Sequence, residues 1–187
     1  MCAAESATRI VVSGLPASGK STLGAALATA LGIRCLDKDN FLEALFEPHP
    51  DPTPDDRSAL SRKADAQFIE AASQPCDAVL VSWWRHPRSV INSGTPTDWL
   101  RAVAGRRVEL HCQCDPDVAL ARFSTRQRHR GHGDAQRDHT ALARTFHTQA
   151  ALGPLGVGHL VPVDTHDRVD VATVVRLVQR ASDQAAR

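Results

Sequence analysis

Short apolar runs alternate with longer stretches of helical periodicity along most of this chain. Each apolar run has the length of a buried strand and is bounded by polar or turn-forming residues. Strands that alternate with helices are typical of a parallel sheet covered on both faces. We therefore predict an α/β fold, a three-layer α/β/α arrangement around a five-stranded parallel sheet. The predicted strands lie near residues 9–13, 33–36, 78–82, 107–112 and 159–163.

A final amphipathic helix is predicted to begin near Val169. Val171, Val174, Val175 and Val178 recur at helical spacing there, so one side of this helix should pack on the sheet.

Three insertions interrupt the alternation of strands and helices, and they follow strands. Ligands of open α/β sheets bind at the carboxyl ends of the strands, so function is expected in these insertions. The first, within a substrate-side insertion of about 40–75, contains a stiff proline-rich stretch expected to shape a substrate lid. The insertions contain residues 47–54, 82–96 and 122–137.

The segment Gly14–Ser21 has the spacing G-x-x-x-x-G-K-S, directly after the first strand and before a helix-forming stretch. This context makes it a P-loop, in which backbone N–H groups and a helix N-terminus point at phosphates. Lys20 would reach the terminal phosphates, and the Ser21 hydroxyl would ligate Mg²⁺. The sequence thus predicts a nucleoside triphosphate site. Its expected residues are Gly14, Ala17, Ser18, Gly19, Lys20, Ser21 and Thr22.

Two acids, Asp37 and Asp39, follow the second strand at the mouth of the P-loop. Phosphoryl transfer to a hydroxyl needs a carboxylate that orients the acceptor and takes its proton, and another acid commonly supports Mg²⁺. We assign Asp39 as the candidate base and Asp37 as the magnesium-side acid. The alternative is helix capping, because an aspartate before residues 41–46 is a good N-cap.

The third strand lacks an acid at its carboxyl end. Asp77 stands at its start, at the edge away from the phosphates, and Ser82 follows it. This argues against motor-type and switch-type ATPases and leaves magnesium support to Ser21, Asp37 and water.

An arginine-rich segment is expected to form a lid over approximately 124–138. Arg122 and Arg126 are four residues apart, so they would share one helix face and point at the transferring phosphates. Two alternatives are a solvated helix end and a small RNA-binding patch. Phe123 is the one phenylalanine, tyrosine or tryptophan in residues 122–137, and this scarcity of stacking residues disfavours nucleic acid.

Trp83, Trp84 and Arg85 follow the third strand and are candidate substrate residues. Adjacent side chains on a strand point to opposite faces, so one tryptophan is expected to face the site, where a ring-shaped acceptor could stack. Arg85 could hold a carboxylate, a phosphate or ring hydroxyls. The alternative places both tryptophans in packing roles.

Composition narrows the possibilities further. The 187 residues fit a single domain over 1–187, and a net charge of +1 argues against broad binding to nucleic acid or membrane. Residues 1–9 lack an apolar signal core, so a cytoplasmic location is expected.

The five cysteines fit reduced thiols better than a disulfide framework. Cys112 and Cys114, although beside His111, are expected in the core rather than on a metal.

The chain resembles P-loop small-molecule kinases of the nucleoside-monophosphate-kinase-like superfamily. The resemblance rests on the P-loop, the Asp37/Asp39 pair and the arginines at 122, 126, 128 and 130. Shikimate kinase, gluconate kinase and chloramphenicol phosphotransferase belong to that group, as do P-loop 5′-hydroxyl polynucleotide kinases. The resemblance implies ATP and Mg²⁺ as cofactors, with Asp39 activating the acceptor and Asp37 on the magnesium side. The chain departs from shikimate kinases in having Ser82–Arg85 where they have a glycine-rich triplet.

These features together predict an ATP-dependent phosphotransferase that acts on a hydroxyl of a small polar metabolite, sugar, nucleoside or antibiotic. No guanine-reading Asn-Lys-x-Asp motif is present, which favours ATP. A 5′-hydroxyl nucleic-acid kinase and a non-catalytic ATP-binding module are the alternatives. The partner is expected to be a small molecule, and the chain a monomer or homodimer.

Overall fold

The computed structural model describes residues 7–49, 51–134 and 137–185. Pro50 of the proline-rich stretch, residues 135–136 of the predicted lid and residues 1–6, which bear on the expected absence of a signal core, lie outside the described residues.

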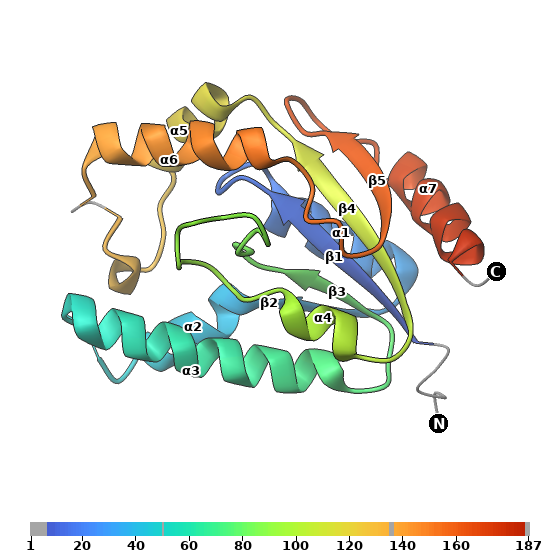
Figure 1. Cartoon of the computed structure of the whole chain (residues 1–187), viewed down its shortest axis with the longest axis horizontal. Helices are drawn as coiled ribbons and strands as arrows, with labels where there is room; N and C mark the ends of the chain where they lie inside the picture. The colour runs from blue at the N-terminus through green and yellow to red at the C-terminus, as the bar shows by residue number, and fades with distance from the viewer. Residues whose placement is uncertain (1–6, 50, 135–136, 186–187) are drawn as a thin grey trace.

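The sheet has five strands in the order β2-β3-β1-β4-β5, and every pair is parallel. This confirms the predicted fold class, and no predicted strand end differs from the observed one by more than one residue. Because the strands run in one direction, their carboxyl ends meet at a single edge (Figure 1). The strands are β1 (Thr8–Gly14), β2 (Arg34–Asp37), β3 (Ala78–Val81), β4 (Arg106–Gln113) and β5 (His159–Asp164).

Helices cover both faces of this sheet (Figure 1). One face packs against α1 (Lys20–Leu31) and α7 (Val171–Gln184), and α3 (Pro54–Ser73) lies against the other. The remaining elements are α2 (Lys38–Phe46), α4 (Asp98–Ala102), α5 (Pro116–Thr125), the short 3₁₀ helix η1 (Arg130–His132) and α6 (His139–Leu152).

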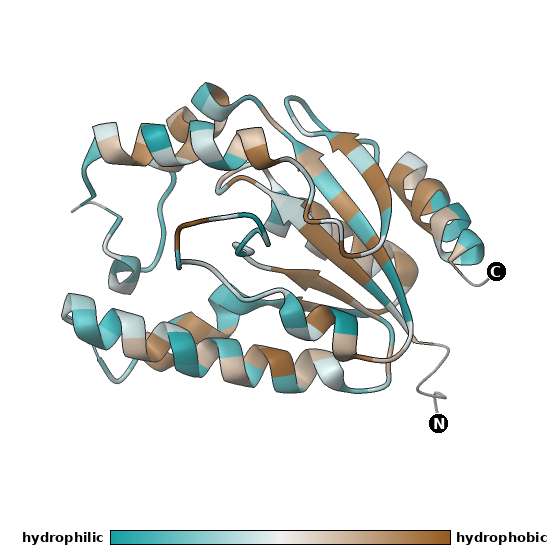
Figure 2. Cartoon of the chain, in the orientation of Figure 1, coloured by the Kyte–Doolittle hydropathy of each residue, from teal (hydrophilic) through white to brown (hydrophobic). Residues whose placement is uncertain are grey.

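The core beneath α1 and α7 is aliphatic and closely packed. Gly24 lets α1 approach the sheet, because a Cβ atom there would lie 2.5 Å from Val81 Cγ2. On α7, Val174 and Val178 are buried, as their spacing predicts. Figure 2 shows the result: β3 is hydrophobic throughout, whereas β4 and β5 carry alternating hydrophilic bands.

One of those hydrophilic positions is a fully buried carboxylate, Glu109 on β4. It accepts hydrogen bonds from Ser13 Oγ at 2.7 Å and from the N–H groups of Leu155, Gly156 and Val157 at 2.7, 2.8 and 3.3 Å. Four donors satisfy the lone pairs that burial removes from water. Glu109 therefore fixes the segment that joins α6 to β5.

We expect Glu109→Gln to lower the free energy of unfolding by about 3 kcal/mol, because an amide presents N–H groups to backbone donors and leaves them unsatisfied. Chemical denaturation measures this. Glu70→Gln, on an exposed part of α3, is the control and should change stability by less than about 0.5 kcal/mol. Equal effects of the two substitutions would contradict the role given to Glu109.

Candidate functional site

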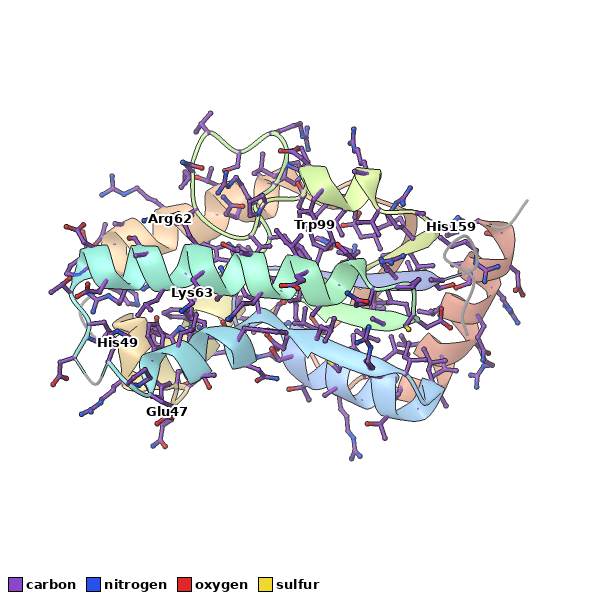
Figure 3. All side chains as sticks on the ribbon, turned by 90° about the horizontal axis from the view of Figure 1, so that it is seen from below. Glu47, His49, Arg62, Lys63, Trp99 and His159 are labelled. Carbon is purple, nitrogen blue, oxygen red and sulfur yellow. The ribbon has the colours of Figure 1, made fainter. Side chains whose placement is uncertain are left out.

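A cavity of about 740 Å³ opens at the carboxyl edge of the sheet. Its walls come from the P-loop, α2, α3, the segment after β3 and the arginine-rich segment. Figure 3 shows Arg62, one of the lining residues, in the half of the molecule that contains Glu47 and His49, whereas His159 at the start of β5 lies at the opposite end. The cavity thus occupies the position where the sequence predicts the ligand.

Most of the predicted site residues line this one cavity. Gly14 and Ser18 do not line it but shape the loop, and Trp84 is the exception discussed below. The predicted residues that line it are Ala17, Gly19, Lys20, Ser21, Thr22, Asp37, Asp39, Trp83, Arg85, Arg122 and Arg126.

The P-loop backbone has the shape of a phosphate site. Gly14 has φ +129°, and a Cβ atom there would lie 2.6 Å from Cys112 O, so only glycine fits. Gly19, with φ +93°, caps α1 without any side-chain hydrogen bond, which leaves the first N–H groups of the helix to face the cavity. A helix N-terminus of this kind attracts anions.

Lys20 carries a desolvated charge at the floor of the cavity. Its side chain is buried, and Nζ donates a hydrogen bond to Leu15 O within the loop. Burial lowers the pKa of Lys20 to about 8, although the nearby carboxylates of Asp37 and Asp39 act in the opposite direction. A bound polyanion would replace the solvation by water that the Lys20 ammonium group loses on burial.

Asp37 connects two helices. Its carboxylate caps α2 by accepting a hydrogen bond from Asp39 N at 3.0 Å, and it also accepts one from the Ser21 hydroxyl. Burial raises the pKa of Asp37, and these two hydrogen bonds oppose the increase. Capping and proximity to Ser21 therefore coexist in one residue, and the pair supplies the oxygen ligands that Mg²⁺ prefers.

Asp39 lies in the first turn of α2, on the wall of the cavity. Its carboxylate forms an ion pair with Arg128, which also contacts Asp134 at 3.3 Å. The site residues chosen from the sequence did not include Arg128. The alternating arginines at 126, 128 and 130 were the available signal, but spacing alone could not select among them.

The predicted geometry of the lid arginines is wrong in one respect. Helix α5 ends at Thr125 and Arg126 has extended backbone, so Arg122 and Arg126 do not share a helix face. Arg122 instead donates to Thr165 O at 2.9 Å and to His166 O, which ties α5 to the segment after β5.

Arg126 points into the cavity in a low-dielectric setting. Its guanidinium stacks 4.2 Å from the Phe123 ring centroid and lies 3.6 Å from Asp134. Burial and the neighbouring Arg128 lower the pKa of Arg126 to about 10, and its buried Nε has no hydrogen-bond partner. Such a guanidinium gains most from an added negative charge.

The segment after α5 docks on α2. The Phe46 ring stacks on His129 at 5.5 Å and meets His132 edge-on at 5.3 Å, and His132 Nε2 lies 2.9 Å from Glu43. A Cβ atom at Gly131 would lie 2.4 Å from the Phe46 ring, so this contact requires glycine. The docking brings Arg126 and Arg128 over the P-loop side of the cavity.

The two tryptophans after β3 separate as their alternation predicts. Trp83 lines the cavity, but Trp84 is only 4% exposed and donates its indole N–H to Val12 O at 2.8 Å. The assignment of Trp84 to the substrate is therefore corrected, because this ring packs with Phe68 and Trp99 in the core. Arg85 lines the cavity, and its buried Nε has no hydrogen-bond partner.

A polar network beneath the cavity was not anticipated. Ser82 Oγ lies 2.6 Å from Thr95 Oγ1, which donates to Asp65 at 2.7 Å, and Asp65 pairs with buried Lys38 at 2.8 Å. These residues are far apart in the sequence, so no local pattern identifies them. The network joins α2, α3 and the segment after β3 into one wall.

The cysteines and the helices were considered for metal binding and for membrane insertion, respectively. Cys112 is buried in the core and Cys114 partly so, and the described residues contain no group of three or more His, Cys, Asp or Glu side chains that could hold a metal. None of the described helices is sufficiently long and apolar to cross a membrane.

A family model described as an AAA domain matches residues 10–149. The chain belongs to this family. No curated protein matches the sequence.

Three solved structures that share this fold are kinases by their own descriptions. A candidate kinase from Chloroflexus aurantiacus J-10-fl superimposes with a TM-score of 0.75 at 22% identity, covering 97% of this chain and 98% of its own. Shikimate kinase from Bacteroides thetaiotaomicron gives 0.55 at 16%, covering 92% and 97%. A sugar kinase from Janibacter sp. HTCC2649 gives 0.54 at 17%, covering 95% of each chain. At these identities the likeness shows that this chain shares the fold of those proteins.

We expect Lys20→Met to stabilise the protein at pH 7, by on the order of 3 kcal/mol, because the lowered pKa of about 8 measures a charge that is costly to bury. The folded pKa lies below the ordinary 10.5, so the cost is full below pH 8 and disappears as the pH rises through 8 to 10.5. Denaturation at pH 7 and pH 10 measures the difference between variant and parent. A difference that does not narrow at pH 10 would contradict this account.

Proposed function

We propose that this protein is an ATP-dependent phosphotransferase that moves the γ-phosphoryl group to a hydroxyl of a small polar metabolite. The observation that carries the proposal is the arrangement of Lys20 and Asp39 in a single cavity, at the P-loop and on the opposing helix α2. One group binds phosphate and the other can accept a proton, which are the two requirements of the reaction.

The P-loop residues fit a nucleotide. The N–H groups at the start of α1, with the charge of Lys20, would hold the β- and γ-phosphates. Mg²⁺ would be held by Ser21 and, directly or through water, by Asp37, and when bound it neutralises charge on the phosphate oxygens. Adenine would lie beside the segment after β5, which Arg122 ties to α5 through its hydrogen bond to Thr165 O.

On the acceptor side, Asp39 would orient the hydroxyl and take its proton. Its ion pair with Arg128 fixes the direction of the carboxylate. Arg126, whose buried Nε has no hydrogen-bond partner, would stabilise the charge that spreads over the phosphoryl group during transfer. Trp83 and Arg85 would bind the acceptor through ring stacking and charge-assisted hydrogen bonds.

This arrangement supports catalysis over simple nucleotide binding, because a carboxylate facing the P-loop is not needed to retain ATP. The nucleic-acid alternative has less support, since the cavity is bounded by Phe46 on the lid side and the chain has a net charge of only +1. A small acceptor of sugar, nucleoside or antibiotic type therefore fits best.

Asp39→Asn should lower the turnover number by roughly 10²–10⁴ while ATP binding persists, because the amide keeps the size of the side chain but cannot take the proton. Asp37→Asn is the matched comparison. Asparagine still caps α2, so this variant should fold, and it should raise the magnesium concentration needed for half-maximal rate.

Steady-state rates over a magnesium titration, with ATP binding measured by calorimetry, test both variants. If Asp39→Asn kept full rate and Asp37→Asn lost it at saturating magnesium, the two roles would have to be exchanged.

A further inference from the structure

A second cavity, of about 560 Å³, lies on the sheet face opposite α1 and α7. Side chains of β1, β4 and β5 form its floor, and the ends of α6 and of the P-loop form its walls. The cavity of about 740 Å³ that contains the P-loop is called the nucleotide cavity below. Of the described residues, only Pro16 and Trp83 line both cavities. The site proposed above shares Trp83 with this cavity but places no phosphate group in it.

The two cavities differ in charge. The described lining of the nucleotide cavity includes nine lysines and arginines, whereas that of the second cavity includes none. Asp115 and Asp164 line the second cavity, and both ring nitrogens of His86 are engaged, because Nδ1 accepts from Arg88 N at 3.0 Å and Nε2 donates to Pro154 O at 2.9 Å. An anion would lose its hydration there without gaining a cationic partner.

On the floor of the cavity, the His111 ring offers Nε2 as a hydrogen-bond acceptor. Ser13 Oγ donates its only hydrogen to the Glu109 carboxylate at 2.7 Å, so at 2.8 Å from His111 it must accept from Nδ1–H. Burial lowers the pKa of His111, which favours the neutral ring. The proton is then on Nδ1 and the lone pair on Nε2, which has no hydrogen-bond partner among the described residues.

The rest of the lining suits a flat apolar body. Leu15, Leu155 and Pro162 offer aliphatic surface, and the half-buried ring of Trp83 stands at the boundary with the nucleotide cavity. Gln149 adds a polar group at the end of α6. Pockets of this composition bind ring-bearing small molecules.

We propose that this second cavity is a binding site for a small ring-bearing molecule, uncharged or cationic, that donates an N–H or O–H hydrogen bond to His111. The proposal does not depend on phosphoryl transfer, because binding is measured without turnover.

Three probes of one shape and different charge test it: benzylamine, benzyl alcohol and benzoate. Titrations of the ¹⁵N-labelled full chain, followed through the Trp83 indole N–H, should give dissociation constants at least about ten-fold lower for benzylamine and benzyl alcohol than for benzoate. Saturating ATP should leave benzylamine bound. Displacement of benzylamine by ATP, or equal affinity for benzoate, would overturn the proposal.

Two matched variants locate the probes. Leu160, 43% exposed on β5, lines the cavity, and Leu177, 38% exposed on α7, does not. Leu160→Arg should weaken benzylamine about ten-fold or more and strengthen benzoate, while Leu177→Arg should change neither. His111→Phe should weaken benzyl alcohol without excluding its ring. If Leu160→Arg and Leu177→Arg behaved alike, the probes would not bind in this cavity and the proposal would fail.

Discussion

The common direction of the five strands is the constraint on which this molecule depends. All the segments that follow strands therefore meet at one edge, and the P-loop, the Asp37–Asp39 pair, the Trp83–Arg85 segment and the arginine-rich segment all lie there. Residues more than 100 positions apart form one cavity without any long-range motif. Asp37 then joins two of these segments directly, since it binds the first turns of both α1 and α2.

The candidate site also contains buried charges. Lys20 and Arg126 both have lowered pKa values because they are desolvated, and each is incompletely compensated by nearby carboxylates. Cations held in this state cost stability, and a bound anion would offset that cost. The buried charge of Glu109, in contrast, is compensated by four hydrogen-bond donors, and it supports the fold.

The sequence predicted what local patterns can encode. Apolar runs located all the strands, and the P-loop spacing located the phosphate-binding backbone, because both depend on neighbouring residues. Tertiary contacts lay outside its reach. Arg128 pairs with Asp39 across 89 positions, and the Ser82–Thr95–Asp65–Lys38 network joins α2, α3 and the segment after β3. Trp84 lies in the core, where its indole N–H donates to Val12 O. The expected helix through Arg126 failed because α5 ends at Thr125 and the chain turns toward α2.

The central claim is that the γ-phosphoryl group of ATP leaves this cavity on a hydroxyl. Its most direct test is to incubate the protein with Mg²⁺, ATP labelled in the γ-phosphate and a panel of sugars, nucleosides and hydroxyl-bearing antibiotics, and to separate the labelled products. The account predicts label in a phosphate ester of one acceptor class, formed with equal release of ADP. Label that stays in ATP, or appears only in inorganic phosphate with every acceptor, would contradict it.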